Sequence, residues 1–296
     1  MNQPFLTIVI PTRNSARSLG ITLNSIKKQN CPKAFYEVVV ADNLSTDGTL
    51  KIAEKYGARI LRVKGSPPRV CEQRNLGAKI AKGNYLFFVD SDVELSTNLI
   101  KNFAKKISKK DTIDAWYVPY RIVAQNKFLT KVRNFEDDFY KNSVVAAARI
   151  IKKESFWKTE NQYDPSLSPG PADWDLNLQL KDIGAEFGYL NEHVYHHEEN
   201  LTLWQYITKK TNYIEGGEIY RTKWKKKNPM LFHEVVEKQY GPRYRLFGIV
   251  MEKGNWKKAL KNIDLFLVFL LIKTASFVVY FIGLQRKRIL GPVQFK

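Results

Sequence analysis

The stretch YLFFVDSDVEL, residues 85–95, joins an apolar run directly to two acidic residues. Residues 85–89 predict a short buried strand, because they are apolar and are bounded upstream by Gly83 and Asn84. The carboxylates of Asp90 and Asp92 that follow repel each other and are costly to desolvate. The pair is therefore either solvated where the strand leaves the core, or it has a cation bound between its carboxylates.

Apolar runs and helix-forming segments alternate on the N-terminal side of this strand. The sequence predicts strands at 6–10, 36–41 and 59–63, and helices that begin at Ser15 or span 49–56 and 70–82. This alternation is typical of βαβ units and predicts an α/β fold with a mostly parallel sheet. Ligands of such sheets bind outside the carboxyl ends of the strands. Asp42 follows the strand at 36–41, so it is expected beside Asp90 and Asp92 in one crevice.

The remainder of the chain continues this pattern and then changes in composition. We expect a strand over 114–124, a helix over about 128–150, and a further helix after the Pro/Gly-rich loop that ends at Pro171. From 201 to 228, tryptophans and tyrosines alternate with lysines and arginines. Such a mixture suits a helix lying in a membrane interface or a nucleic-acid-binding surface.

The segment 263–284 is apolar apart from Asp264 and Lys273. As a helix it is long enough to cross a hydrocarbon core of ~30 Å. Basic residues flank it on both sides, which leaves its orientation open. Lys273 is costly in the middle of a bilayer and predicts either a protein neighbour or a helix that is not fully embedded.

Three segments are therefore expected along the chain. They are a catalytic domain over 1–200, an amphipathic membrane-interface segment over 201–256, and a transmembrane helix with a basic tail over 257–296. No basic-then-apolar leader precedes the first strand, so no signal peptide is predicted.

The charge balance narrows the class of partner. The chain of 296 residues has 48 basic and 29 acidic residues, a formal net charge of +19. Such a field suits nucleic acid, an anionic membrane surface or phosphorylated substrates. The 44% of hydrophobic residues argues against disorder as the main state. Two cysteines, Cys31 and Cys71, are too few for a disulfide framework and suit a reducing compartment.

The acids after residue 89 suggest a metal site. Asp90 and Asp92, with Ser91 between them, offer hard oxygen ligands that can hold Mg²⁺ or Mn²⁺ together with substrate phosphates. His196 or His197 could supply a further ligand to the same metal.

Other side chains suggest binding and catalysis at the same crevice. Arg69 and Arg74 could neutralise a diphosphate, or they form a solvated basic helix face. Asp42 could accept hydrogen bonds from a nucleobase or a ribose. One of Asp173 and Asp175, which follow the Pro/Gly-rich loop, could act as general base towards an acceptor hydroxyl.

Four motifs then carry a family resemblance. They are LTIVIPTRN (6–14), VVVADNLSTDGT (38–49), RNLGAKIAKGNYLFFVDSDVELS (74–96) and YDPSLSPGPADWDLNLQLKDIG (163–184). In order and spacing they resemble the family 2 glycosyltransferases with the GT-A fold, over about residues 4–200. The resemblance implies an inverting, metal-dependent transfer of a sugar from a nucleotide-sugar.

The resemblance also implies individual roles. Pro11 and Arg13 fall where the family lines the nucleotide pocket, and Asp42 falls on the acid that contacts the base. Asp90 and Asp92 fall on the metal-binding motif, where the cation bridges the diphosphate. These roles agree with the chemistry inferred from the residues themselves, since a divalent cation stabilises a diphosphate leaving group.

Three departures from the family pattern matter. Asn43 and Leu44 stand where Asp-Gly is common, so the base pocket is expected to differ in detail. Ala172 replaces the usual Glu before the acceptor-activating aspartate, which leaves Asp173 as first candidate and Asp175 as the reserve. No QxxRW motif follows the histidines, which argues against a processive polymerase.

The resulting expectation is a membrane-attached enzyme with its catalytic domain in the cytoplasm. It would transfer one sugar, with mannose from GDP-mannose favoured on resemblance to membrane mannosyltransferases, to a lipid-linked polyprenyl acceptor. Membrane lipids are expected partners and nucleic acid is not; a homo-oligomer stays open. The alternatives are a UDP-sugar-dependent transferase, a polyprenyl-phosphate sugar synthase, a nucleotidyltransferase, and a basic nucleic-acid-binding protein.

Overall fold

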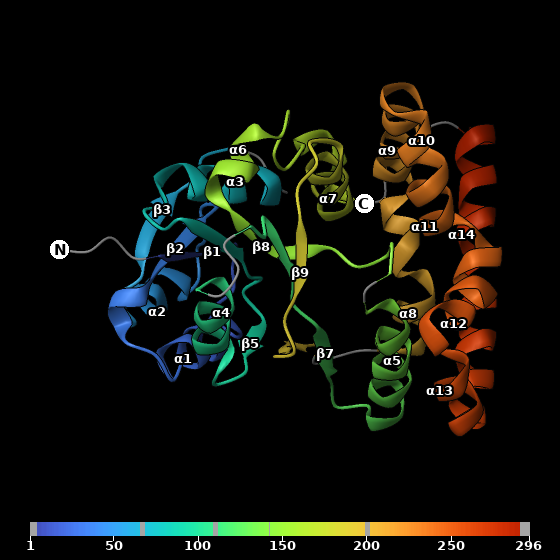
Figure 1. Ribbon diagram of the computed structural model, residues 1–296, viewed down its shortest axis with the longest axis horizontal. Helices are drawn as coiled ribbons and strands as arrows, with labels where there is room; N and C mark the ends of the chain where they lie inside the picture. The colour runs from blue at the N-terminus through green and yellow to red at the C-terminus, as the bar shows by residue number, and fades with distance from the viewer. Residues whose placement is uncertain (1–4, 66–68, 109–111, 142, 199–201, 291–296) are drawn as a thin grey trace. The chain divides into compact units, whose positions relative to one another are not determined.

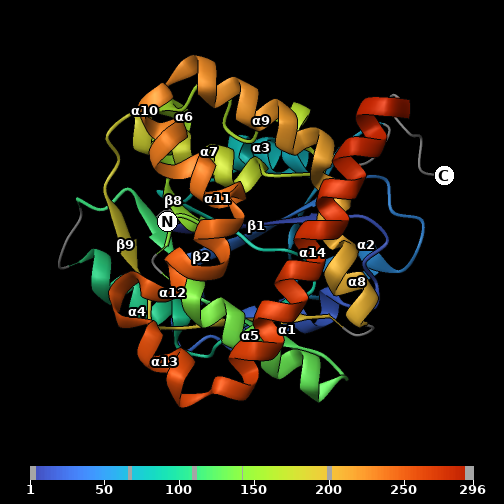
Figure 2. The same ribbon diagram turned by 90° about the vertical axis from the view of Figure 1, so that its right-hand side faces the viewer.

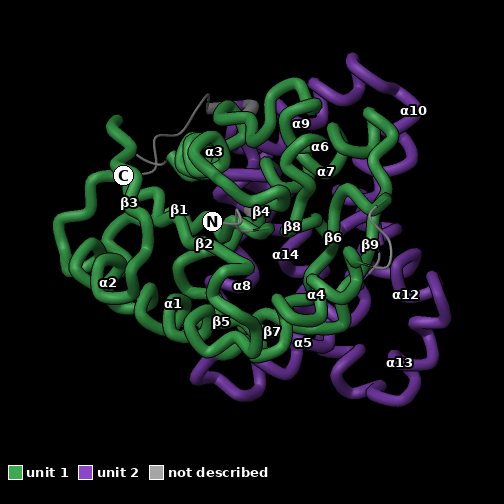
Figure 3. The backbone as a smooth tube through the Cα atoms, turned by 60° about the vertical axis from the view of Figure 1, so that its left-hand side comes forward, with its two compact units in different colours: residues 1–123, 146–168, 172–198 green, residues 124–145, 169–171, 199–296 purple. Residues whose placement is uncertain are grey.

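The computed structural model describes residues 5–65, 69–108, 112–141, 143–198 and 202–290 (Figure 1). The chain divides into two compact units (Figure 3). Unit 1 comprises residues 1–123, 146–168 and 172–198, and unit 2 comprises 124–145, 169–171 and 199–296.

Unit 1 is built on a mixed sheet in which seven described strands follow the order β3-β2-β1-β4-β8-β6-β9. Their bounds are β1 Leu6–Thr12, β2 Tyr36–Asp42, β3 Arg59–Arg62, β4 Tyr85–Phe88, β6 Ala115–Tyr117, β8 Ala148–Lys152 and β9 Phe187–Tyr189. β1 pairs in parallel with both β2 and β4, and β2 pairs in parallel with β3. β4, the strand that opens the stretch 85–95, therefore lies in the middle of the sheet.

Helices of unit 1 cover this sheet. They are α1 Leu19–Lys27, η1 Lys33–Phe35, α2 Thr49–Lys55, α3 Val70–Ile80, α4 Leu99–Ile107, α6 Lys153–Lys158, η2 Pro165–Leu167 and α7 Ala172–Asp182. β1 and β4 are buried along their whole length, as expected of central strands with both faces covered. The predicted α/β fold with a mostly parallel sheet is confirmed.

The single strand predicted over 114–124 is wrong. The segment forms two strands, β6 and β7 (Tyr120–Val123), and β7 belongs to a three-stranded sheet in the order β5-β10-β7. β5 spans Val93–Leu95 and β10 spans Val194–His197. Pro119 separates β6 from β7, and a proline cannot donate a hydrogen bond within a ladder.

The helix predicted over 128–150 is also wrong in its second half. Helix α5 spans Lys127–Tyr140, and residues 148–152 form β8, antiparallel to β4 and to β6. β8 lies between two strands, so its backbone groups find partners on both edges. Ile150 and Ile151 are fully buried there. Tertiary pairing therefore decides the structure of this segment, against its local helical pattern.

Unit 2 is helical. Besides α5 it contains α8 Leu203–Thr208, η3 Lys209–Tyr213, α9 Ile214–Lys227, α10 Pro229–Leu231, η4 Phe232–Val236, α11 Glu237–Tyr240, η5 Tyr244–Gly248, α12 Ile249–Met251, η6 Glu252–Gly254, α13 Trp256–Lys261 and α14 Ile263–Leu290. Its own core joins α5, α12 and α14 through Phe139, Ile249 and Phe269. Figure 2 shows the long α14 in front of the other helices of this unit.

Among the described residues, one helix is long and apolar enough to cross a membrane. It covers Ile263–Lys287 within α14, and 28% of its most apolar window is buried inside the protein. Only the length and the apolar composition of this helix support a membrane span, and the core helix of a soluble protein can meet the same two criteria.

Candidate active site

Two loops at the carboxyl ends of β1 and β2 are tied to each other. Asn14 N donates to Ser45 Oγ at 2.8 Å, and Ser15 N donates to Thr49 Oγ1 at 2.7 Å. In return, Thr46 N donates to Asn14 Oδ1 at 2.9 Å. These bonds hold both loops at the edge of the sheet where ligands of α/β folds bind.

Asp42 is fully buried at the end of β2. Its Oδ1 accepts from Thr12 Oγ1 at 3.1 Å and from Ser45 Oγ, and its Oδ2 accepts from Ser45 N at 2.9 Å. The carboxylate thus shapes the loop after β2. The next residue, Asn43, donates to Val63 O at 3.0 Å, while its buried Oδ1 has no hydrogen-bond partner among the described residues.

Three further predicted residues lie around these loops. Pro11 is buried in β1, in register with Ala41 of β2. Arg13 is exposed directly after β1. Ser91 Oγ donates to Ser15 Oγ at 3.0 Å, which links the DSD turn to the loop after β1.

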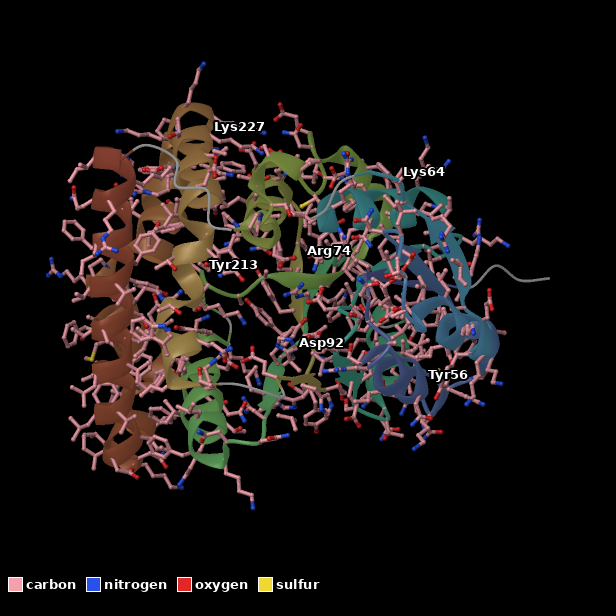
Figure 4. The ribbon with its side chains drawn as sticks, turned by 180° about the vertical axis from the view of Figure 1, so that it is seen from behind. Tyr56, Lys64, Arg74, Asp92, Tyr213 and Lys227 are labelled. Atoms are coloured by element: carbon pink, nitrogen blue, oxygen red, sulfur yellow. The ribbon has the colours of Figure 1, made fainter. Side chains whose placement is uncertain are left out.

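Arg74 connects the acidic end of β4 to the start of α7. From α3, its Nη2 donates to Asp90 Oδ1 at 2.7 Å and its Nη1 donates to Asp173 Oδ1 at 3.1 Å. The guanidinium also stacks over the Tyr163 ring, 4.8 Å from its centroid. The Arg74 side chain is only 6% exposed, so a buried cation holds the carboxylates of Asp90 and Asp173. Arg74 is labelled in Figure 4, as is Asp92 of the neighbouring turn.

A second arginine, Arg149 of β8, joins the same cluster. Its Nη1 donates to Asp173 Oδ1 at 3.2 Å, and its guanidinium stacks over the Tyr120 ring at 5.1 Å. The sequence did not predict this residue, because its segment was assigned to a helix. Its position beside the β-branched pair Ile150 and Ile151 is the signal that could have indicated a strand.

The arginines set the charge state of Asp90. Burial on its own raises the pKa of this carboxyl, but the charges of Arg74 and Arg149 and the hydrogen bond from Arg74 outweigh it and lower the pKa to about 2. Asp90 is therefore ionised over the whole physiological range.

The two adjacent histidines of β10 have different partners. His196 Nε2 donates to Asp92 Oδ2 at 3.1 Å, whereas His197 Nε2 contacts Glu94 Oε2 at 3.0 Å. Successive side chains of a strand point to opposite faces, so only one of the pair can reach Asp92. Burial lowers the pKa of His196, but the hydrogen bond to Asp92 and the nearby carboxylates outweigh it, and the net effect raises the pKa above 6.5.

The carboxylates fit a cation that substrate phosphates would help to hold. The described ranges contain no group of three His, Cys, Asp or Glu side chains arranged to bind a metal ion. However, Asp92 Oδ1 is buried and accepts no hydrogen bond within those ranges. Mg²⁺ is usually held by one or two carboxylates together with phosphate oxygens, so an orphaned carboxylate oxygen suits it.

The predicted bases, Asp173 and Asp175, differ in their surroundings. Both hydrogen bonds of Asp173 use Oδ1, and its Oδ2 accepts none from the described residues. Asp175 is fully buried and its Oδ2 accepts from Gln179 Nε2 at 2.7 Å. Arg69, the other predicted diphosphate ligand, pairs with Glu72 of α3 at 3.3 Å.

The acids and arginines thus gather at one end of a mostly parallel sheet, where proteins of the α/β class bind their ligands. The profile of glycosyl transferase family 2 matches residues 7–167, more than half of the chain. The chain belongs to this family.

Curated relatives match parts of the chain. Poly(ribitol-phosphate) β-N-acetylglucosaminyltransferase TarS of Staphylococcus aureus is 38% identical over 110 residues, which are 35% of this chain and 19% of TarS. Glycosyltransferase AglE of Haloferax volcanii is 33% identical over 93 residues, 30% of this chain and 31% of AglE. The chain thus spans less than a third of the length of either relative.

Solved structures share the fold over nearly the whole chain. The mannosyltransferase PcManGT from Pyrobaculum calidifontis, in complex with GDP-Man and Mn²⁺, has a TM-score of 0.63 at 15% identity and covers 99% of this chain and 89% of its own. S. aureus TarS 1–349 in complex with UDP-GlcNAc has a TM-score of 0.58 at 18% identity and covers 98% and 93%. At such identities the likeness concerns the fold, and it agrees with a GT-A architecture.

Proposed function

We propose that this chain transfers a single sugar from a nucleotide-sugar to an acceptor hydroxyl with inversion at the anomeric carbon, in a metal-dependent reaction. One observation carries the proposal: Asp90 after β4 pairs with Arg74, and Arg74 and Arg149 together hold Asp173. The cluster combines groups that bind a diphosphate with a carboxylate that can accept a proton.

On the donor side, Asp90 and Asp92 would hold Mg²⁺ or Mn²⁺, with His196 orienting Asp92 through its hydrogen bond. The cation, when bound, neutralises charge that develops on the leaving diphosphate. Pro11, Arg13 and the loop after Asp42 would border the nucleoside. The unpartnered Oδ1 of Asn43 offers an acceptor for a base or ribose donor, in place of the acid that the family commonly has there.

On the acceptor side, Asp173 is the proposed general base. Its Oδ2 accepts no hydrogen bond within the described chain, so this oxygen can take the proton of the attacking hydroxyl. Arg74 and Arg149 orient the carboxylate through Oδ1. Asp175 has no comparable access, because it is fully buried.

Mannose from GDP-mannose is the donor that we favour. The proposal is supported by the likeness to PcManGT, which carries GDP-Man and Mn²⁺ and extends over 99% of this chain. A UDP-sugar is the second candidate, because the local identity to TarS of 38% is higher.

The acceptor is proposed to be lipid-linked, at a membrane surface on the side where nucleotide-sugars are made. The basic and aromatic segment 201–256 and the apolar helix that follows support this part of the proposal. In this account the catalytic domain covers 1–200, and 257–296 carries the membrane-binding helix.

The test is a donor panel with product analysis. The purified 296-residue chain is incubated with GDP-mannose, UDP-GlcNAc or UDP-glucose, Mn²⁺ and a membrane extract, and the released nucleotide is identified. Release of a nucleoside diphosphate with one donor, together with a β-linked product from an α-linked donor, supports the proposal. Release of pyrophosphate identifies a nucleotidyltransferase, and release of no nucleotide from any donor overturns the proposal.

A further inference from the structure

Helix α14 has one buried face and one exposed face. Its buried side consists of Leu265, Phe269, Ile272, Lys273 and Ser276. Its exposed side is apolar as well: Leu267, Leu271, Val278, Phe281 and Ile282 are each between 47% and 71% exposed. The spacings of three, four and seven residues along this second set place the side chains in one stripe. Within the part of the chain that the structure describes, α14 therefore packs against protein on one side only.

The charge in the middle of α14 faces protein. Lys273 Nζ pairs with the carboxylate of Glu136 on α5, which also accepts hydrogen bonds from the hydroxyls of Tyr140 and Tyr206. Arg245 Nη2 donates to Tyr140 Oη at 2.6 Å and lies 3.9 Å from Glu136. Both cations and the carboxylate are almost fully buried, at 2–4% side-chain exposure. Of the two alternatives that the sequence leaves for Lys273, the structure thus provides a protein neighbour, Glu136.

Contacts with the unit extend along most of α14. Leu265 is in the core near its beginning, and near its end the Cα of Gly283 is so close to Ile214 that a Cβ there would lie 2.8 Å from Ile214 Cδ1. At about 1.5 Å per residue these contacts cover ~27 Å, almost the thickness of a hydrocarbon core. Near the end of α14, Lys287 Nζ pairs with Glu218 of the partner helix α9 at 2.9 Å, so charged groups of this unit border the helix there as well.

We propose that α14 does not cross the bilayer but lies in the plane of one leaflet, with its stripe Leu267, Leu271, Val278, Phe281 and Ile282 inserted among the lipid chains of an anionic membrane. The inference rests on the membrane attachment in the proposed function and refines it. It does not depend on which sugar is transferred or on whether transfer occurs.

A groove beside the stripe supports lipid as the occupant. It has a volume of about 530 Å³ and is lined by Phe277, Val278, Phe281 and Ile282 of α14 and by Tyr240 and Arg221. The lining is mostly apolar, with Arg221 and Glu237 as its charged residues, which suits the chain of a lipid. Further basic residues stand at both ends of α14: Lys257, Lys258, Lys261, Arg286 and Lys287. They favour an anionic leaflet over a second copy of this strongly basic chain.

The topology test uses two single cysteines. In a chain with Cys31 and Cys71 replaced by serine, Lys257→Cys and Arg286→Cys mark the two ends of α14, and both parent side chains are exposed. Membranes from expressing cells are prepared as right-side-out and as inverted vesicles and treated with an impermeant maleimide. We expect both cysteines to react in the same preparation and both to be protected in the other. Reaction of the two cysteines in opposite preparations means that α14 spans, and it overturns the proposal.

A second measurement tests the inserted face. The double variant Leu267→Glu/Leu271→Glu should reduce binding to phosphatidylglycerol vesicles by at least about tenfold, because carboxylates are costly in hydrocarbon. The far-ultraviolet spectrum and nucleotide binding should not change, since both side chains are exposed. Ile183→Glu, at an exposed apolar position of unit 1, is the matched control and should bind vesicles normally. If the double variant keeps its vesicle binding and instead dissociates from a dimer to a monomer, the face contacts a second copy and the proposal is wrong.

Discussion

At the residue scale, Arg74 joins two carboxylates that lie far apart along the chain. Asp90 and Asp173 were both predicted as functional residues from their motifs, yet nothing in the sequence indicates that they share one guanidinium. Such a contact depends on how α3, β4 and α7 meet in space. A buried cation without a counter-charge is costly, and the carboxylates of Asp90 and Asp173 together compensate the charge of Arg74.

The first prediction concerns Asp173. Asp173→Asn removes the proton acceptor but keeps the shape of the side chain, so kcat should fall by about 10²- to 10⁴-fold while the Kd of the nucleoside diphosphate changes little. Asp182→Asn at the other end of α7 is the control and should leave kcat near the wild-type value. Activity that survives in Asp173→Asn indicates a lipid phosphate as the nucleophile, because a phosphate needs no strong base.

The second prediction concerns backbone strain at Leu44. This residue has φ of 53° in the loop after β2, at a position where the family commonly has glycine. A left-handed conformation costs a non-glycine residue about 1–2 kcal/mol, so Leu44→Gly should raise the Tm of unit 1.

Lys51→Gly, in the middle of α2, serves as the comparison for Leu44→Gly. It should lower the Tm, because glycine costs about 1 kcal/mol in an ordinary helix interior. Equal effects of the two glycine substitutions in differential scanning calorimetry would contradict the strain argument. A Kd for nucleotide measured on both variants shows whether the bulk of Leu44 also shapes the base pocket.

At the element scale, the N-terminal strands and helices could be predicted and the middle of the chain could not. The predictions for β1 to β4 succeed because each strand has its own apolar run and each crossover its own helix. β8 fails because a five-residue strand gains its stability from pairing with β4 and β6, which are distant in sequence. Arg149 was missed together with the strand that carries it.

The third prediction follows from the histidine of β10. The pKa of His196 is raised above 6.5, so its pairing with Asp92 stabilises the fold fully below about pH 6.5 and this contribution is lost as the pH rises through the raised value. The difference in Tm between wild type and His196→Gln should therefore be larger at pH 6 than at pH 9. A difference that is independent of pH would mean that His196 stabilises by packing alone.

The fourth prediction concerns the docking of α14 on α5. Glu136→Gln leaves Lys273 and Arg245 buried without a counter-charge and should cost roughly 3–5 kcal/mol. Lys273→Met should cost less, because Arg245 and the two tyrosines still partner Glu136. The double variant should be more stable than Glu136→Gln alone.

Hydrogen exchange of the α14 backbone, in detergent, measures this series. Protection should fall in the order wild type, Lys273→Met, Glu136→Gln. Equal protection in all variants would show that the buried charges do not hold the helix, and the argument for its one-sided contact with unit 2 would fail.

At the scale of the whole molecule, the net charge of +19 favours an anionic binding partner. The net charge alone leaves nucleic acid, a membrane and phosphorylated substrates open. The pairing of Lys273 with Glu136 explains how a charged residue can belong to an apolar helix, and it could not be read from the sequence because 137 positions separate the two. Most of the strongly exposed large apolar side chains belong to unit 2, which fits the proposed contact of α14 with lipid.

The central claim is that the strand-end carboxylates bind a nucleoside diphosphate through a divalent cation. Calorimetric titration of the purified 296-residue chain with GDP and with UDP, with and without Mn²⁺, tests it most directly. We predict that one of the two nucleotides binds only when Mn²⁺ is present, with GDP favoured, and that Asp92→Asn abolishes the metal-dependent part. Failure of both nucleotides to bind, or equal binding with and without Mn²⁺, would contradict the claim.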